Sequence, residues 1–321
     1  MNLFVAEILD IQDGSYKDGD EVSFMNYSQG FELIPRLALL LTDRAAAAAI
    51  THFDNGETFR NKSEWTLAIK EYTEAIRLNP NYALAYHNRG RAYEGNTDND
   101  RAIADYTAAI KLNPNYAYSY QYWGELYRLK GDYDWAIADC TEAIRLEPNR
   151  ANPYAIRGAT YYNKKDYDRA IADLTVAIRL SPNYTFAFYN RGLAYQDKND
   201  HDRAIVDFTE AIRTNSSYHR AYTNRGYIYI EYKKDYDKAI ADFTEAIRLN
   251  ADNADYFLNR GVAYYRKGDY DQAIADYTQA IRINPSFALT YSNRSNSYRQ
   301  KGTLPEQMLI RQKPRNLIRL Q

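Results

Sequence analysis

Residues 83–114 read ALAYHNRGRAYEGNTDNDRAIADYTAAIKLNP, and variants of this stretch recur along most of the chain. The recurrence is clearest in an alanine followed by isoleucine, found at Ala68, Ala102, Ala136, Ala170, Ala204, Ala239 and Ala273. Successive members are 34 residues apart, except for one step of 35 between Ala204 and Ala239. A fixed period of this size is typical of solenoids, in which each unit mainly contacts its neighbours. We therefore expect a long repetitive surface suited to binding, rather than one enclosed cleft.

Each repeat carries the spacing of two amphipathic helices. In the first expected helix of each repeat, an aromatic residue lies four positions before a glycine and another lies three positions after it, as in Tyr86, Gly90 and Tyr93. The second expected helix contains an alanine and an aromatic residue, as in Ala102 and Tyr106. Offsets of three and four place side chains on one stripe of a helix, and the small residues allow two helices to approach closely. The glycine column, meaning the same position in successive repeats, is Gly56, Gly90, Gly124, Gly158, Gly192, Gly226 and Gly261. We predict an all-α fold of fourteen helices in seven hairpins, followed by a capping helix.

The residues between these runs agree with helix ends. Proline, which cannot continue a helix interior, follows the second run at Pro80, Pro114, Pro148, Pro182 and Pro285. Asp132 and Asp269 each follow a glycine and are suited to cap the next helix. The acidic clusters at 98–100 and 197–202 lack the glycine and final glutamate of a calcium-binding EF-hand loop, so we interpret them as caps as well.

The chain resembles the tetratricopeptide-repeat family over about residues 49–302. The family signature of an aromatic residue, Gly, Tyr, Ala, an aromatic residue, Ala and Pro is matched by Tyr86, Gly90, Tyr93, Ala102, Tyr106, Ala109 and Pro114. Departures are local: Cys140 and Leu174 stand in the second aromatic column, and His52 stands in the first. The resemblance implies a right-handed superhelical solenoid of antiparallel helix pairs, whose inner face binds peptide or protein partners.

The period divides the chain into successive segments. We expect a leader at 1–48, partly disordered and helical from about Thr42 or Asp43. Seven repeats then follow at 49–82, 83–116, 117–150, 151–184, 185–218, 219–253 and 254–287. Residues 288–302 are expected to cap the array as the first helix of a degenerate eighth repeat, before a basic tail at 303–321. The second helix of that repeat is not expected, because Gln307, Arg311 and Pro314 take the places of alanine, aromatic residue and alanine.

Composition limits the function classes. The 41 Lys and Arg residues against 42 Asp and Glu give a formal charge of −1, so there is no overall basic surface for nucleic acid. Residues 37–41 form the longest apolar run near the start, far short of a membrane span, and no secretory signal is visible. We expect a cytoplasmic protein without membrane contact, and its oligomeric state is left open.

The sequence contains no recognisable catalytic or metal-binding motif. The single cysteine, Cys140, lies in a packing column and is interpreted as a small buried hydrophobic residue. The four histidines lack the spacing of metal ligands, and the glycines follow the repeat rather than a phosphate-binding motif. We therefore predict a protein that is not an enzyme and that carries no cofactor and no metal.

One polar column indicates ligand binding. Asparagine lies two residues before the glycine position at Asn88, Asn190, Asn224, Asn259 and Asn293. Two residues turn a helix by about 200°, so these amides should lie away from the packing stripe. Asparagine is a poor helix former, and its amide can both donate to and accept from an extended peptide backbone. Similar columns line the groove of some tetratricopeptide proteins, notably the O-linked sugar transferases. The alternative is that each asparagine bonds a neighbouring helix.

Apolar residues interrupt or flank that column. Tyr122 and Ile156 replace asparagine in two repeats, and Tyr118, Phe186 and Tyr227 lie about one turn away. They could form an apolar section of a peptide-binding groove, since exposed apolar patches often mark interaction sites. Equally, they could pack between successive first helices. A chaperone-adaptor groove is not expected, because no lysine stands directly before the asparagines.

Two charged columns are interpreted as structural. Arginine precedes the glycine position at Arg89, Arg157, Arg191, Arg225, Arg260 and Arg294. Aspartate recurs in the second helix at Asp105, Asp139, Asp173, Asp207, Asp242 and Asp276. We expect these columns to pair and fix the register, each exposed pair contributing about 0.2–1 kcal/mol.

Three functions are compatible with the sequence. The favoured one is a non-catalytic scaffold that binds a peptide or protein segment. A nucleic-acid-binding helical-repeat protein is disfavoured by the neutral charge, although salt-sensitive RNA binding would support it. The third is a repeat subunit that recruits substrates to an enzyme on another chain.

Overall fold

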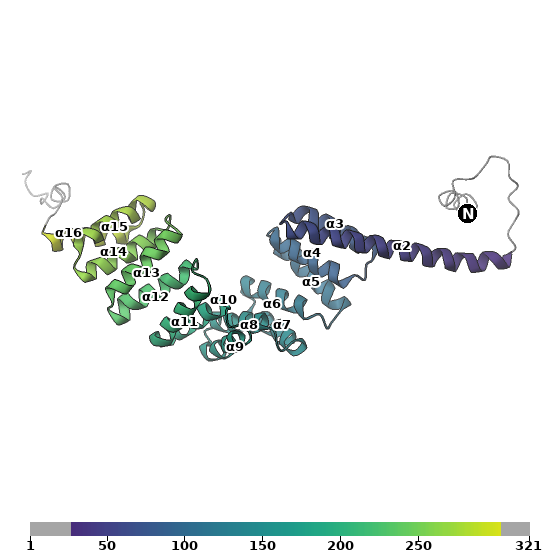
Figure 1. Ribbon diagram of the computed structural model, residues 1–321, viewed down its shortest axis with the longest axis horizontal. Helices are drawn as coiled ribbons and strands as arrows, with labels where there is room; N and C mark the ends of the chain where they lie inside the picture. The colour runs from purple at the N-terminus through teal and green to yellow at the C-terminus, as the bar shows by residue number, and fades with distance from the viewer. Residues whose placement is uncertain (1–26, 303–321) are drawn as a thin grey trace, which may run out of the picture. The chain divides into compact units, whose positions relative to one another are not determined.

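The computed structural model describes residues 27–302 of the chain, with side chains described from Arg44 onward (Figure 1). These residues form fifteen α-helices and one short π-helix and contain no strand. The predicted all-α helical solenoid is confirmed. The chain divides into two compact units, one ending at Thr97 and the other beginning at Asp98.

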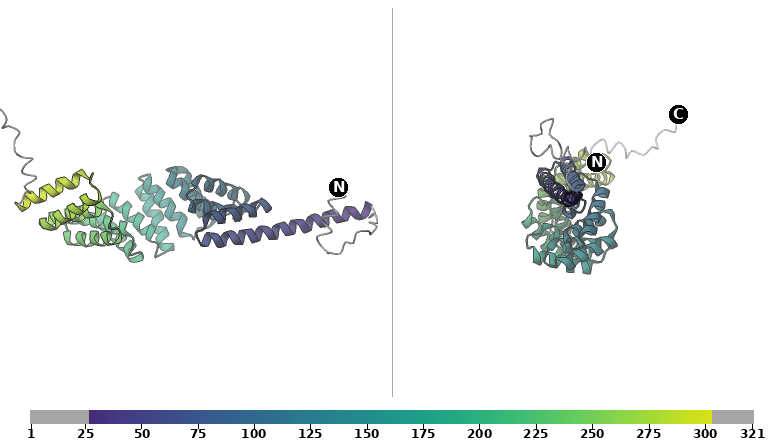
Figure 2. Two further views of the ribbon diagram at one scale, coloured as in Figure 1. Left: turned by 90° about the horizontal axis from the view of Figure 1, so that it is seen from above. Right: turned by 90° about the vertical axis from the view of Figure 1, so that its right-hand side faces the viewer.

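The described residues of the first unit form three helices. They are α2 (Tyr27–Asn61), α3 (Trp65–Leu78) and α4 (Ala83–Gly95). The prediction that helix begins near Thr42 was wrong, because α2 already begins at Tyr27 and runs well past the ends of α3 and α4 (Figures 1 and 2). Residues 31–41 contain several leucines and an arginine, which are good helix formers, and these outweigh Pro35, which disfavours a helix interior. The expectations for residues 1–26 lie outside the described part of the chain.

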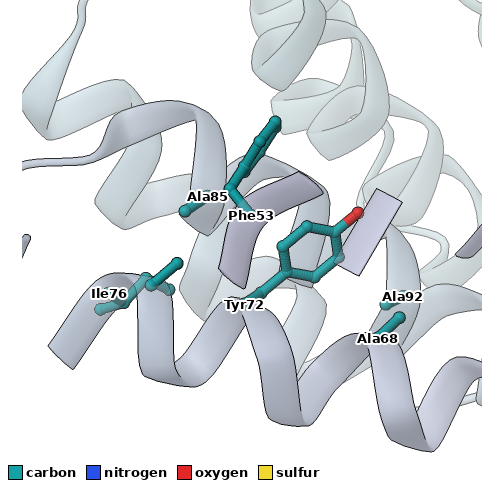
Figure 3. Packing of buried hydrophobic residues seen from close by; sticks show 7 residues of the cluster. Phe53, Ala68, Tyr72, Ile76, Ala85 and Ala92 are labelled. Carbon is teal, nitrogen blue, oxygen red and sulfur yellow. The ribbon is translucent and has the colours of Figure 1, made fainter. Parts of the chain in front are cut away.

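A small aromatic core holds this unit together. Tyr72 of α3 is fully buried, and its ring lies 5.7 Å from that of Phe53 on α2. Ala85 and Ala92 of α4 complete the cluster (Figure 3). A Cβ atom on Gly56 would lie 2.6 Å from the Tyr72 ring, closer than any real contact. The glycine column is therefore the place where the aromatic side chain of the second helix meets the backbone of the first.

The second unit continues the alternation of first and second helices. Its described members are α5 (Asn99–Leu112), α6 (Ala117–Lys130), α7 (Tyr133–Leu146), α8 (Ala151–Asn163), α9 (Tyr167–Leu180), α10 (Thr185–Asp197), α11 (His201–Thr214), α12 (His219–Ile228), η1 (Tyr229–Lys233), α13 (Tyr236–Leu249), α14 (Ala254–Lys267), α15 (Tyr270–Ile283) and α16 (Ala288–Lys301). Each helix from α6 to α16 packs against the one before it in the chain, and α12 to α15 lie side by side (Figures 1 and 2). The predicted capping helix corresponds to α16.

Close packing at the glycine column recurs in this unit. A Cβ atom on Gly192 would lie 2.8 Å from the ring of Phe208. In the two repeats that lack the second aromatic residue, the same role falls to Cys140, 2.8 Å from a Cβ on Gly124, and to Leu174. Cys140 is fully buried, as predicted, and burial raises the pKa of its thiol.

The one step of 35 residues is accommodated by the π-helix. In α10 and its following turn, the Asp200 amide donates to the Tyr195 carbonyl, five residues back, at 2.8 Å. The equivalent bond after η1 joins Asp235 to Tyr229, six residues back, at 3.0 Å. The extra residue of this repeat therefore lies between Tyr229 and Asp235. A wider helical turn absorbs it, so the helices on either side keep their register.

The predicted N-caps are mostly present. The carboxylates of Asp98, Asp200 and Asp269 each accept from the backbone amide three residues later, at 3.2 Å. This supports capping as the role of the acidic clusters. Asp132 was predicted to cap α7 but makes no side-chain cap bond. Its preceding residue, Gly131, has the left-handed φ of 88° that ends α6.

The arginine and aspartate columns pair within four hairpins, as predicted, and these pairs are largely buried. Arg191 of α10 makes two parallel bonds, both 2.8 Å long, to Asp207 of α11. It also donates to Thr175 of the preceding hairpin at 3.0 Å. The Asp207 side chain is only 2% exposed. The same clamp is formed by Arg157 with Asp173, Arg225 with Asp242, and Arg260 with Asp276.

The range of about 0.2–1 kcal/mol for exposed pairs therefore does not apply to these buried ones. Burial raises the pKa of Asp207 and of Asp242, and the facing arginine opposes that increase. Removing one partner of such a buried pair leaves a desolvated charge and costs about 3–5 kcal/mol. The clamp fixes the distance between the two helices of a hairpin and ties each hairpin to the one before it.

Within the described residues, no helix is both long and apolar enough to cross a membrane. The same part of the chain contains no cluster of three or more His, Cys, Asp or Glu side chains arranged to hold a metal ion.

Candidate functional site

Three members of the asparagine column have the same local geometry on consecutive first helices, α10, α12 and α14. The amide nitrogen of each donates to the backbone carbonyl four residues earlier on its own helix. The distances are 2.7 Å for Asn190 to Phe186, 2.9 Å for Asn224 to Arg220, and 2.9 Å for Asn259 to Asp255. Because only the NH2 group can donate, this bond fixes the orientation of the planar amide and directs Oδ1 away from that carbonyl.

The amide oxygens of these three residues accept no hydrogen bond from the described part of the chain. No donor among residues 44–302 bonds to Oδ1 of Asn190, Asn224 or Asn259. Asn224 and Asn259 are half-buried, whereas Asn190 is only 9% exposed. The two partly exposed residues therefore offer an oriented hydrogen-bond acceptor, one from each of two adjacent repeats.

One of the three asparagines also bonds a neighbouring helix, which was the alternative role considered for this column. Asn224 also donates to the Tyr189 hydroxyl of α10 at 3.1 Å. Tyr189 packs edge-on against Tyr218, and burial raises its pKa, so the hydroxyl stays protonated at neutral pH. A parallel link joins Tyr256 of α14 to His219 of α12 at 2.7 Å. These contacts hold the first helices of neighbouring repeats in place beside the asparagines.

The two outer members of the column lie elsewhere. Asn88 belongs to α4 in the first unit and is 7% exposed. Asn293 is half-buried on α16. Asn190, Asn224 and Asn259 therefore share one local hydrogen-bond geometry, and Asn293 continues the column on α16, the first helix that follows α14.

Of the five predicted apolar residues, Ile156 is buried at 7% exposure, and the other four divide into two pairs. Tyr122 stacks on Tyr106 at 5.9 Å, as expected for packing between repeats, and Tyr118 lies under the Arg150 guanidinium at 3.6 Å. Phe186 precedes Asn190 by one helical turn, and its own carbonyl receives the asparagine amide. Tyr227 is 43% exposed and follows Asn224 by three residues, so the two share a helix face.

The structure adds one aromatic residue that the sequence analysis missed. Tyr232, in the π-helix, is 48% exposed and lies edge-on to Tyr227 with ring centroids 6.4 Å apart. Its other side stacks on the His201 ring at 3.6 Å. The 35-residue step in the period was the available signal, because an inserted residue is free of the packing columns and π-helical turns are frequent at functional sites.

The repeats can also be matched to a known family. Sequence profiles of the tetratricopeptide repeat match residues 56–96, 83–116, 117–150, 158–199, 186–218, 232–268 and 254–287. The chain belongs to the tetratricopeptide-repeat family. Tetratricopeptide repeats are typically interaction scaffolds that bind proteins or peptides rather than catalytic domains. A search of curated proteins finds no significantly similar sequence.

Solved tetratricopeptide structures share the fold at low sequence identity. A chain of the Cut9–Hcn1 hetero-tetramer of the APC/C superposes with a TM-score of 0.62 at 18% identity, over 75% of this chain and 48% of that one. A tetratricopeptide protein from Parabacteroides merdae gives 0.57 at 16% identity, over 78% and 99%. PilF from Pseudomonas aeruginosa gives 0.59 at 19% identity, over 65% and 95%. The chain thus spans about half the length of the Cut9–Hcn1 chain, and these likenesses concern the fold alone.

Proposed function

We propose that this tetratricopeptide protein is a non-catalytic scaffold that holds an extended peptide or protein segment against α10, α12 and α14. The observation that carries the proposal is the pair of oriented, unused Oδ1 acceptors on Asn224 and Asn259. Each can accept a backbone N–H from the ligand, which is recognition that does not depend on the ligand's side chains. Tyr227 shares a helix face with Asn224, and its exposed ring lies 6.4 Å from that of Tyr232, so the two rings offer a contact for one apolar ligand residue.

The test begins with peptides selected against the full-length chain from a displayed library of random 15-residue sequences. Asn224→Ala combined with Asn259→Ala should weaken the selected peptides by about fivefold to 150-fold, since each neutral hydrogen bond contributes about 0.5–1.5 kcal/mol. Helix content should be unchanged, because alanine is the better helix former. The matched control replaces Gln272 and Gln279, two exposed amides on the second helix α15, with alanine.

A second measurement separates backbone recognition from simple contact. Replacing one peptide N–H at a time with an N-methyl group should abolish binding at two positions in the wild-type protein. N-methylation at those two positions should have little further effect on binding to the double variant, which lacks the two amide acceptors. Equal affinity for the double variant and the glutamine control would exclude the asparagines as the recognition element. Loss of helix content in the double variant alone would instead assign them to the helix framework.

A further inference from the structure

Among the described residues, no second helix covers α16 on the face that, in the complete hairpins of the second unit, packs against a second helix. In α14 the equivalent face consists of Phe257, Arg260, Gly261 and Tyr264, and α15 packs on it. In α16 the corresponding residues are Tyr291, Arg294, Ser295 and Tyr298, which we call the open α16 face. Tyr291 is 40% exposed, and Ser295 is half-buried where Gly261 is buried.

Arg294 is already placed for a clamp, but residues 44–302 supply no carboxylate to complete it. Its Nη1 donates to Thr278 at 3.2 Å, as Arg260 does to Thr244 at 3.1 Å. Its guanidinium lies 5.6 Å from the Tyr291 ring centroid, as that of Arg260 lies 5.7 Å from Phe257. The Nε atom, however, is buried and has no partner among the described residues, whereas Nε of Arg260 donates to Asp276 at 2.8 Å.

The sequence that follows α16 does not supply the missing group in register. One 34-residue period after Asp276 comes Ile310, and the places of the two alanines and the aromatic residue fall to Gln307, Pro314 and Arg311. An aspartate at that position would neutralise Arg294 and satisfy Nε, which makes a carboxylate-bearing helix the complementary occupant.

We propose that the open α16 face is a docking site for an amphipathic helix of a partner protein, which takes the place of a second helix and inserts an aspartate against Arg294. Ser295 also restricts which residue can follow the aspartate in the partner helix. At the equivalent Gly261, an added Cβ would lie 2.7 Å from the ring of Tyr277, the residue after Asp276. Ser295 carries that Cβ, so the partner helix needs a small residue after its aspartate.

The probe is a synthetic peptide with the sequence of residues 270–283 and Tyr277→Ala, with a lactam bridge between exposed positions 275 and 279 to stabilise the helix. Fluorescence anisotropy with the full-length chain should show saturable binding. The substitution Asp276→Asn in the peptide should weaken binding at least tenfold. In the Arg294→Gln protein the two peptides should bind equally, whereas the control Arg299→Gln, exposed on the same helix, should keep the tenfold preference.

The steric requirement at Ser295 is tested separately, by the relative affinity of two peptides that differ at position 277. The peptide that retains tyrosine at position 277 should bind poorly to the wild-type chain, and Ser295→Gly should reverse the order of the two peptides. This ratio of affinities does not depend on the overall stability of α16. Three results would overturn the proposal: no saturable binding, an aspartate preference that survives Arg294→Gln, or self-association that disappears in Arg294→Gln. The last would assign the face to a second copy of this chain.

Discussion

The most informative perturbation is Asp139→Asn, because Asp139 is the one member of its column in α6–α15 that lacks an arginine. Trp123 stands in the arginine column on α6. Asp139 is 7% exposed, and its Oδ2 has no hydrogen-bond partner in the described part of the chain. Nearby charges are already engaged: on α6, Glu125 binds Arg128. On α8, Arg157 binds Asp173 and Thr141.

The magnitude follows from the pKa of this carboxyl group. Burial raises the pKa of Asp139 from 3.8 to about 7. The pKa of Asp139 is higher in the folded state than in the unfolded state. The protonated carboxyl group therefore makes its full contribution to stability below about pH 4, and this contribution is lost as the pH rises to about 7. At about 1.36 kcal/mol per pH unit, the free energy of unfolding should fall by up to about 4 kcal/mol across this window.

Asparagine cannot ionise, so Asp139→Asn should be close to wild type near pH 4 and more stable at pH 8, by up to about 4 kcal/mol. The assay is urea unfolding followed by circular dichroism between pH 4 and 8. Hydrogen exchange of the α7 amides should accompany it, because a repeat array can unfold in parts.

The matched control is Asp207→Asn, one column member with its arginine present. It should destabilise the protein at pH 8 by about 3–5 kcal/mol, since it leaves Arg191 buried without a counter-charge. The reasoning would be refuted if Asp139→Asn also destabilised the protein at pH 8, or if it kept the pH dependence of the wild type.

Two further perturbations test the framework. Gly192→Leu should lower the free energy of unfolding by about 1–3 kcal/mol, because its Cβ would lie 2.8 Å from the Phe208 ring. Hydrogen exchange should accelerate first in α10 and α11, and an unchanged melting temperature would mean that the packing face is assigned wrongly. Deleting Tyr232 should restore a 34-residue step and convert η1 to α-helix while the other helices remain, since the π-helical turn absorbs one residue. A new structure or amide exchange in α12 and α13 would check this, and unfolding of that hairpin would contradict it.

Much of the fold was accessible from sequence because its determinants are local and repeated. Gly192 and its equivalents mark the close approach of two helices, and the spacing to the next alanine indicates which faces meet. The pairing of Arg191 with Asp207 was predicted from two columns, but its burial was not. Burial depends on how neighbouring hairpins stack, as the bond from Arg191 to Thr175 shows.

The candidate site was accessible only in part. The recurrence of Asn224 and Asn259 was visible in the sequence, and it led to the expectation of amides that face a ligand. The sequence could not show that each NH2 group is bonded to its own helix, because that depends on the side-chain rotamer. Their role in binding stays a prediction.

By itself, the sequence determined the helix pairs, the repeat family and the columns that pack. Each of these depends on 3.6-residue periodicity or on recurrence at 34 residues, and both are readable along one dimension. Only the tertiary structure decided that α2 begins at Tyr27, that a π-helix absorbs the extra residue, and that Asp139 is buried. The sequence already places Trp123 where an arginine would stand. Burial, however, depends on how neighbouring helices pack, which a linear pattern does not record.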